Sequence, residues 1–256
     1  MKHIQSRDNP FFKELKRLAQ SGRERRKTGR TLLDGIHLIT AYETAVGSVE
    51  NLAVSESGLE RAEICDFIAG REAVLLSDAL FREVGVVDHP SGIMAVAEPP
   101  AGGKAPDGAA DTVLLDGLQD PGNVGTLLRT AAAAGFRQVL LAPDCAAPWS
   151  PKVLRAGQGA HFVIDIFEDA DLASFLKSYA GTAAVTCLEG AQSLFEARWE
   201  GPVAWVFGSE GLGVRPEVAA AAKLRIRIPM PGQVESLNVG AAAAVCLFET
   251  LRRRLA

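Results

Sequence analysis

The sequence predicts an α/β protein of two parts, in which a small N-terminal α/β unit precedes a larger domain with a parallel sheet. Three observations support this. After residue 112, short apolar runs alternate strictly with helical segments, which is typical of a buried parallel sheet covered by helices. Before residue 98, a shorter alternation of the same kind occurs. Between them, residues 98–111 are dominated by Pro and Gly and lack apolar periodicity, as in a linker.

The N-terminal unit is predicted from short elements. An amphipathic helix is expected over residues 10–27, with apolar residues along one side. Strands are predicted at 32–33, 52–54, 73–76 and 93–97, and helices at 37–45 and 60–69.

The C-terminal domain repeats the alternation on a larger scale. Strands are predicted at 112–115, 138–141, 162–166, 183–187, 203–207 and 224–228, with helical segments between them and a final helix over 239–254. In open parallel sheets, ligands bind beyond the carboxyl ends of the strands, so the loops at these ends are candidate sites.

Composition and cysteine usage predict a cytoplasmic protein. Of 256 residues, 48% are hydrophobic and 23% charged, which is ordinary for a soluble protein. The longest apolar run, near 241–248, is far shorter than the ~20 residues of a membrane span, and the N-terminus lacks a signal-peptide core. Four scattered cysteines without a CxxC pair predict reduced thiols and no metal site.

Charge is unevenly distributed along the chain. Residues 1–30 contain ten Lys or Arg against three acidic residues, a net charge of +7, which leaves −11 for the remaining 226 residues. A basic segment on an acidic body indicates contact with a polyanion. A solvated basic helix is the structural alternative.

The first polar loop at a predicted strand end spans residues 116–125 and reads Asp-Gly-Leu-Gln-Asp-Pro-Gly-Asn-Val-Gly. Asn123 stands near the start of the next helix, and Arg129 lies roughly 9 Å further along it. A helix cap and a solvated arginine are the plain alternatives. Because residues 127–128 and 131–134 are apolar, we expect Arg129 on a largely packed helix, where it would need an anionic partner.

The second loop, Gly208-Ser-Glu-Gly-Leu-Gly213, follows the strand at 203–207. Its glycines allow a ligand to approach the backbone closely, and Glu210 is its only acid. A Gly-rich turn is the structural alternative. The spacing G-x-x-G-x-G differs from the dinucleotide-binding fingerprint, and no P-loop pattern occurs in the chain.

The third stretch, residues 226–239, reads Ile-Arg-Ile-Pro-Met-Pro-Gly-Gln-Val-Glu-Ser-Leu-Asn-Val. Proline fixes the backbone and glycine permits unusual dihedrals, so the loop is expected to hold one shape. Its backbone donors and acceptors can read the edge of a flat heterocycle such as adenine. Ser236 or Asn238 as the N-cap of the final helix is the alternative, and one residue can serve both purposes.

Together, these motifs resemble those of the SpoU (TrmH-like) branch of the SPOUT methyltransferases. The resemblance spans residues 112–256 and rests on Asp120-Pro-Gly-Asn-Val-Gly125 with Arg129, on 207–213 and on 228–239, in the family's order. Ser150-Pro-Lys-Val-Leu-Arg155 is also similar to a family segment. More loosely, 25–35 and the stretch from His89 to Val96 resemble the opening and the closing strand of the family's substrate-binding region.

The resemblance implies an RNA ribose 2′-O-methyltransferase that uses S-adenosyl-L-methionine. It implies a C-terminal SPOUT domain with a deep trefoil knot over 112–256, a linker over 98–111, and a small L30e-like substrate-binding domain over 1–97. It also implies a homodimer with active sites at the subunit interface. Ribosomal RNA is favoured over transfer RNA, because a separate N-terminal recognition unit is typical of members that act on ribosomal RNA.

The matching positions carry roles by resemblance. Catalytic roles fall to Arg129, Asn123, Glu210, Ser236 and Asn238, and cofactor contacts to Gly208, Gly213, Ile228, Met230 and Leu237. A guanidinium holds its proton strongly, which favours Arg129 as an anchor for phosphate and developing alkoxide over Arg129 as a proton acceptor. Four residues depart from the family pattern: Gly240 replaces a serine, Gly157-Gln158 a Ser-Met pair, and Asp34 a glutamate.

Two rival functions are weighed against this one. A non-catalytic RNA-binding protein on the same fold is disfavoured because every expected polar residue is present. An NAD-dependent oxidoreductase is suggested by the parallel sheet alone, and the missing G-x-G-x-x-G after a first strand counts against it.

Overall fold

The computed structural model describes residues 1–85, 90–101, 105–187, 190–234 and 236–255. Contacts divide the chain into two compact units. The first unit comprises Met1–Ala101 and Trp149–Phe162, and the second comprises Gly102–Pro148 and Val163–Ala256. His89 of the predicted closing segment, linker residues 102–104 and Glu235 of the third motif lie outside the described residues.

The first unit contains a five-stranded mixed sheet in the order β1-β4-β3-β5-β2. Its strands are β1 (Lys2–Ile4), β2 (Thr31–Asp34), β3 (Glu50–Ser55), β4 (Ala73–Leu76) and β5 (Ile93–Ala97). β5 runs antiparallel to both β3 and β2, whereas β1, β4 and β3 are parallel. The four predicted strands are all present, and β1 is an addition that the sequence pattern did not indicate.

The predicted helix over 10–27 is two helices that meet at Ser21. The helices of this unit are α1 (Pro10–Gln20), α2 (Gly22–Thr28), α3 (Ile36–Ala45), η1 (Ser57–Glu60), α4 (Ala62–Ile68) and α5 (Asp78–Val84). Ser21 has an extended backbone and donates its N–H to the Arg17 carbonyl, which ends α1. Its hydroxyl accepts the Glu24 N–H and so begins α2.

Helix α7 (Pro151–Gly157) and the 3-10 turn η2 (Ala160–Phe162) belong to the first unit, although they lie between strands of the second in sequence. Leu154 is fully buried in an apolar cluster with residues of α3, α4 and the sheet. Arg155 Nη1 donates to Asp34 Oδ2 at 2.7 Å. The sequence-based division had assigned this segment to 112–256, whereas these contacts group it with the first unit.

The second unit is built on a seven-stranded sheet in the order β10-β12-β9-β11-β6-β7-β8, with every neighbouring pair parallel. The strands are β6 (Thr112–Asp116), β7 (Gln138–Leu141), β8 (Asp165–Phe167), β9 (Thr182–Thr186), β10 (Gln192–Ser193), β11 (Val203–Gly208) and β12 (Leu224–Arg227). The parallel sheet predicted from the alternation is confirmed. β8 starts later than predicted because 160–162 form the turn η2, and β10 was not predicted.

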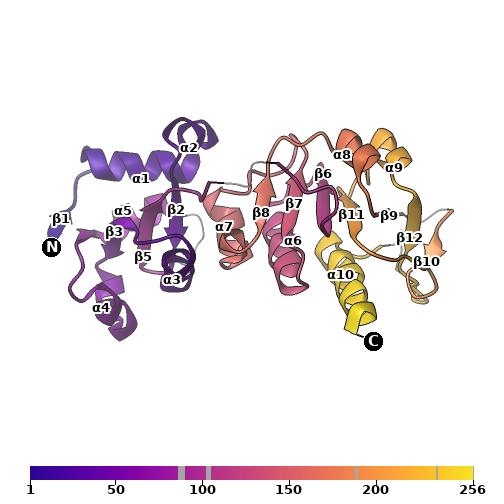
Figure 1. Ribbon diagram of the computed structural model, residues 1–256. Helices are drawn as coiled ribbons and strands as arrows, with labels where there is room; N and C mark the ends of the chain where they lie inside the picture. Colours follow the sequence, from indigo (N-terminus) through magenta and orange to yellow (C-terminus); the bar gives the residue numbers. More distant parts are fainter. Residues whose placement is uncertain (86–89, 102–104, 188–189, 235, 256) are drawn as a thin grey trace. The chain divides into compact units, whose positions relative to one another are not determined.

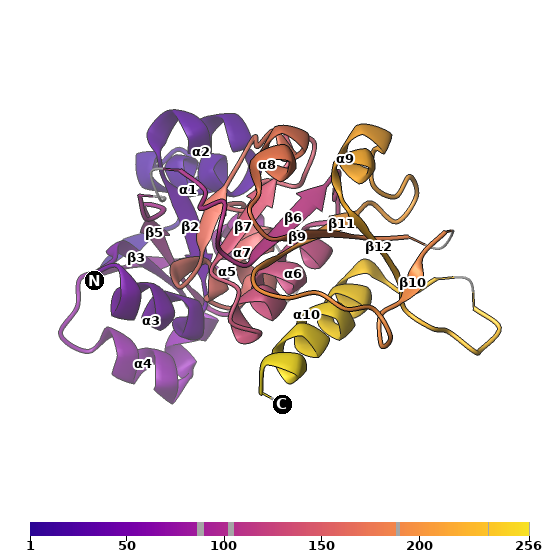
Figure 2. The same ribbon diagram turned by 45° about the vertical axis from the view of Figure 1, so that its right-hand side comes forward.

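Helices cover both faces of this sheet (Figures 1 and 2). α8 (Leu172–Ser178) and α9 (Pro216–Ala221) pack on one face, and α6 (Pro121–Ala133) and α10 (Val239–Leu255) lie side by side on the other. Trp205 of β11 is fully buried and donates its indole N–H to Thr250 Oγ1 of α10 at 3.0 Å. The sheet therefore holds α10 in place. The trefoil knot stays a prediction.

No described helix has both the length and the apolar composition of a membrane span. All four cysteines are described, and no disulfide joins them.

Candidate active site

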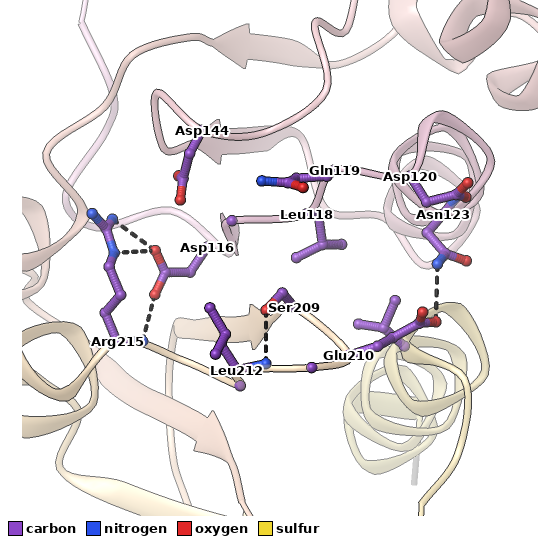
Figure 3. A pocket seen from close by; sticks show the side chains of 14 residues that line it. Asp116, Leu118, Gln119, Asp120, Asn123, Asp144, Ser209, Glu210, Leu212 and Arg215 are labelled. Atoms are coloured by element: carbon purple, nitrogen blue, oxygen red, sulfur yellow. Dashed lines mark hydrogen bonds and ion pairs between the residues drawn. The ribbon is translucent and has the colours of Figure 1, made fainter.

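The loops at the carboxyl ends of β6, β7 and β11 enclose a pocket, which we call the polar pocket (Figure 3). It has a volume of about 340 Å³. Its walls come from the loop after β6, from Asp144 after β7 and from the loop after β11. The lining residues are Asp116, Gly117, Leu118, Gln119, Asp120, Asn123, Asp144, Ser209, Glu210, Gly211, Leu212, Gly213, Arg215 and Val239.

The loop 208–213 separates this pocket from a second one. Ser209 and Gly213 exchange backbone hydrogen bonds in both directions, at 3.1 and 2.9 Å, so the loop closes on itself. Gly213 has a φ of +68°, which suits glycine. A Cβ on Gly208 would lie 2.1 Å from the Gly213 carbonyl carbon. Only glycine at position 208 is compatible with this closed turn.

On the other side of the loop lie two further pockets that share Thr186, Ser236, Leu237 and Ala242, and we call them together the loop pocket. It adjoins the segment before α10 and combines apolar side chains with hydroxyl groups. Its lining includes Thr186, Cys187, Phe207, Gly208, Ser209, Glu210, Gly213, Val214, Ile226, Ile228, Met230, Ser236, Leu237, Asn238, Val239 and Ala242. All five residues predicted to hold the cofactor line this pocket.

Three predicted catalytic side chains form one hydrogen-bond network where the two pockets meet. Asn123 Nδ2 donates to Glu210 Oε1 at 3.0 Å, and Asn238 Nδ2 donates to the same oxygen at 2.9 Å. Asn238 Nδ2 also donates to Asn123 Oδ1 at 3.0 Å. The three residues come from α6, from the loop after β11 and from the start of α10. The structure thus brings the three sequence motifs together at one point.

The capping alternatives are resolved by the same contacts. Asp120 caps α6 by accepting the Asn123 N–H at 2.7 Å, so the Asn123 side chain is left for the network. Asn238 does both tasks, because its Oδ1 accepts the N–H groups of Gly240 and Ala241 while its Nδ2 serves the network. Ser236 lines the loop pocket and is exposed.

Gly240, one of the departures from the family pattern, lies where α10 meets α6. A Cβ there would lie 3.1 Å from both Asn238 Oδ1 and Thr126 Cγ2. A serine would crowd these two atoms, and glycine avoids this contact. The structure also gives two of the other departures a local role. Gln158 ends α7 with a left-handed backbone conformation, and Asp34 forms an ion pair with Arg155.

Arg129 does not lie in either pocket. Its side chain is exposed on α6 and makes no hydrogen bond or ion pair with any residue that the structure describes. The expectation that Arg129 lies packed and needs an anionic partner was therefore wrong, because the apolar residues around it in sequence face the core while Arg129 faces solvent. Its catalytic role stays a prediction.

Three charged residues of the polar pocket were not predicted from the sequence: Asp116, Asp144 and Arg215. Asp116 is 1% exposed and accepts the Arg215 backbone N–H and Nε–H, both at 2.7 Å. This hydrogen bonding raises the pKa of the Arg215 guanidinium. Asp116 and Asp144 follow two neighbouring parallel strands, a signal by which both were recognisable. Arg215 carried no such signal.

The part of the chain that the structure describes contains no group of three or more His, Cys, Asp or Glu side chains placed to hold a metal ion.

A parallel sheet with Gly/Pro-rich loops around two adjoining pockets, joined to a separate α/β unit, defines an enzyme with a substrate-binding domain. Two family models identify it further. The SpoU rRNA Methylase family model matches residues 111–248, and an MRM3-like substrate binding domain matches residues 9–95. The chain belongs to the SpoU rRNA methylase family. The resemblance stated from the motifs is thereby confirmed.

Individual relatives agree over nearly the whole chain. The 23S rRNA (guanosine(2553)-2′-O)-methyltransferase RlmP of Bacillus subtilis is 34% identical over 97% of this chain and 98% of its own length. A crystal structure of an RNA 2′-O ribose methyltransferase is 33% identical, with a TM-score of 0.86 over 99% of this chain and all of that one. An AdoMet-bound rRNA methyltransferase from Sinorhizobium meliloti is 26% identical, with a TM-score of 0.78 over 100% and 98%.

These relatives confirm the predicted class of activity, an RNA ribose 2′-O-methyltransferase, and the predicted cofactor, S-adenosylmethionine.

Proposed function

We propose that this protein methylates the ribose 2′-hydroxyl of a guanosine in 23S ribosomal RNA. The observation that supports this most directly is the network of Asn123, Glu210 and Asn238 between the two pockets. The Bacillus subtilis relative acts, by its name, on a guanosine of 23S rRNA. Methylation of transfer RNA is the competing outcome, and mapping of 2′-O-methyl groups in RNA from a strain lacking the gene distinguishes the two. We also propose that the enzyme is cytoplasmic, and cell fractionation tests this location.

The loop pocket fits the proposed cofactor by the chemistry of its lining. Ile228, Met230 and Leu237 provide apolar contacts for a flat heterocycle, and Thr186 and Ser236 provide hydroxyl groups. Such a mixture of apolar walls and a few polar groups is typical of cofactor sites. When bound, S-adenosylmethionine supplies a methyl group on a sulfonium, whose leaving group is already activated.

The residues of the network supply placement and hydrogen bonding. A ribose hydroxyl is a very weak acid, so we infer that placement contributes most to the rate. Glu210 Oε1 is fixed by two amide groups, and its Oε2 makes no hydrogen bond to a described residue. We assign Asn123, Asn238 and Ser236 to orienting the ribose, and Glu210 to receiving or directing its proton.

We propose a homodimer in which Arg129 completes the site. Arg129 is exposed and roughly 9 Å along α6 from Asn123, so this copy's pockets do not use it. Phe248, 46% exposed on the neighbouring helix α10, offers an apolar contact for a second copy. Light scattering that gives a monomer mass at micromolar concentration would contradict the dimer.

The first test of the function is Arg129→Ala. We expect this variant to fold and to bind S-adenosylhomocysteine normally, while methyl transfer to ribosomal RNA falls at least about 100-fold, because an anchor for developing negative charge is lost. The rate is measured with radiolabelled cofactor. The control is Arg137→Ala, which removes an exposed arginine just beyond the same helix. Near-normal turnover of Arg129→Ala would remove Arg129 from the active site.

We propose that the basic helices α1 and α2 contact RNA phosphates. Of their cations, Arg17, Arg23, Arg26 and Lys27 are exposed and form no ion pair with described residues. Others are already neutralised: Lys16, for example, lies 3.1 Å from Glu83. The substrate-binding family model covers these helices.

Replacing Arg23, Arg26 and Lys27 together by Gln should weaken RNA binding. The slope of log affinity against log salt concentration should fall by up to about three, since each phosphate contact releases counterions. Filter binding at several salt concentrations measures this. Binding of S-adenosylhomocysteine should not change. An unchanged salt slope would show that RNA binds elsewhere.

A further inference from the structure

The polar pocket has no task in the roles assigned so far, although it adjoins the network. It and the loop pocket share Ser209, Glu210, Gly213 and Val239, so they meet at one boundary. Methyl transfer requires the acceptor oxygen in line with, and opposite to, the leaving group. With the cofactor in the loop pocket, the acceptor nucleotide must approach from another side of the network. The polar pocket opens there.

The charges of the polar pocket decide which part of a nucleotide it can take. Its lining contains four carboxylates, Asp116, Asp120, Asp144 and Glu210, and one guanidinium, Arg215. A phosphate placed here would be repelled at short range. A neutral base that presents N–H donors would instead be attracted, and bases of RNA loops are commonly splayed out and read by their edges.

Most of these charged groups are already engaged. Asp120 accepts the Asn123 N–H, Glu210 accepts two amides, and Asp116 is paired with Arg215. Asp144 makes no hydrogen bond or ion pair with a described residue, and Figure 3 shows its carboxylate directed into the pocket beside Gln119. Asp144 is therefore the carboxylate available to a ligand.

Arg215 is held in a fixed position at the pocket wall. Its Nε and Nη2 both contact Asp116 Oδ1 at 2.7 Å, and its Nη1 has no partner in the described part of the chain. The side chain remains 43% exposed although the Asp116 side chain is 1% exposed. Leu212 of the facing loop is 94% exposed and offers an apolar surface to a flat ring.

We propose that the polar pocket binds the guanine base of the nucleotide to be methylated, and that Asp144 determines this choice. The Asp144 carboxylate accepts from guanine N1–H and N2–H₂, and the free N–H of Arg215 donates to O6. Adenine presents an amino donor where guanine has O6 and is disfavoured by the arginine. This assignment rests on the guanosine substrate proposed above.

The test uses Asp144→Asn, because Arg215 variants would leave the buried Asp116 unpaired and destabilise the fold. Asp165→Asn, an exposed aspartate on β8, is the control. The substrate is a 23S rRNA fragment with the mapped target as guanosine or as inosine, which lacks the 2-amino group. For the wild type and the control we expect kcat/KM to favour guanosine by about tenfold or more. For Asp144→Asn this ratio should fall to near one.

A second measurement does not depend on turnover. Free guanosine and inosine are titrated into the full-length protein with S-adenosylhomocysteine present, and amide shifts are followed by NMR. Guanosine should shift residues of the polar pocket in the wild type, and Asp144→Asn should lose the preference for guanosine. A preference that survives in Asp144→Asn overturns the assignment of Asp144, even if methylation proceeds normally. Absence of methylation by the wild type refutes the proposed function instead, and the titration still decides the pocket.

Discussion

The polar pocket and the loop pocket lie on two sides of the same six-residue loop, yet they are built from different groups. The loop pocket takes much of its wall from apolar side chains, among them Ile228 and Met230 of the Gly/Pro-rich stretch. The polar pocket takes its wall from charged side chains, among them Asp116, Asp144 and Arg215. Apolar side chains suit a flat heterocycle whatever its edge presents, whereas charged side chains distinguish one pattern of donors and acceptors from another. The comparison teaches that a constant cofactor suits the first kind of wall and a variable substrate suits the second.

The largest effect is expected at Gly208, because the loop that carries it forms a wall of both pockets. In Gly208→Ala, the added Cβ would lie within 2.1–2.3 Å of backbone atoms of Gly213 and Val214, so the closed turn must open. We expect affinity for S-adenosylhomocysteine to fall at least tenfold, methyl transfer to be lost, and stability to fall by about 1–3 kcal/mol. Calorimetric titration and thermal unfolding measure these changes.

Gly211→Ala is the matched control in the same loop. A Cβ at position 211 meets nothing within 4 Å, so both pockets should survive. Equal damage from the two substitutions would show that the loop tolerates no side chain at all, and would contradict the specific role of position 208.

An intermediate effect is expected at the boundary between the pockets. Glu210→Ala removes the acceptor shared by Asn123 and Asn238, and we expect turnover to fall about 100-fold, with cofactor affinity changed little. Glu210→Gln keeps Oε1 as an acceptor and removes the charge, so it separates the two contributions. Single-turnover rates and calorimetry are the measurements, and Glu196→Ala, at an exposed glutamate that lines neither pocket, is the control.

Should Glu210→Ala lose cofactor binding before it loses turnover, Glu210 would belong to the loop pocket alone. The hydrogen bonds that place Glu210 at the boundary between the pockets would then not reflect its role in methyl transfer.

The two pockets also differ in how far the sequence predicted them. The loop pocket was predicted because many of its residues stand in continuous Gly/Pro-rich stretches, and such stretches indicate an unusual backbone conformation. The polar pocket was not, because Asp116 and Arg215 are 99 residues apart and meet only once β11 pairs with β6. Strand alternation predicted the parallel sheet. It did not predict that α7 packs with the first unit, since that depends on long-range contacts such as Arg155–Asp34.

The smallest effect is expected at a charged cluster that serves neither pocket and therefore isolates stability from catalysis. Glu249 on α10 accepts from Arg252 at 2.7 and 2.9 Å and from Arg253 at 2.7 Å. Arg253 also donates to the carbonyl groups of Leu194 and Ala197, which ties the segment after β10 to the helix.

These hydrogen bonds, chiefly those from Arg252, lower the pKa of Glu249 from 4.5 to about 2. Because the pKa of Glu249 is lower in the folded state, its ionised carboxylate stabilises the folded protein. This contribution to the free energy of unfolding is fully present above pH 4.5 and is lost as pH falls from 4.5 towards 2. Glu249→Gln should therefore be less stable at pH 7 by about 1–3 kcal/mol, reduced by solvent around Arg252, and the difference should shrink with acid. Urea unfolding at several pH values measures this difference in stability, with Glu200→Gln as control.

Methyl transfer by Glu249→Gln at neutral pH should be unchanged, because the cluster touches neither pocket. A loss of turnover in a folded Glu249→Gln variant would mean that α10 transmits strain to Asn238 at its other end.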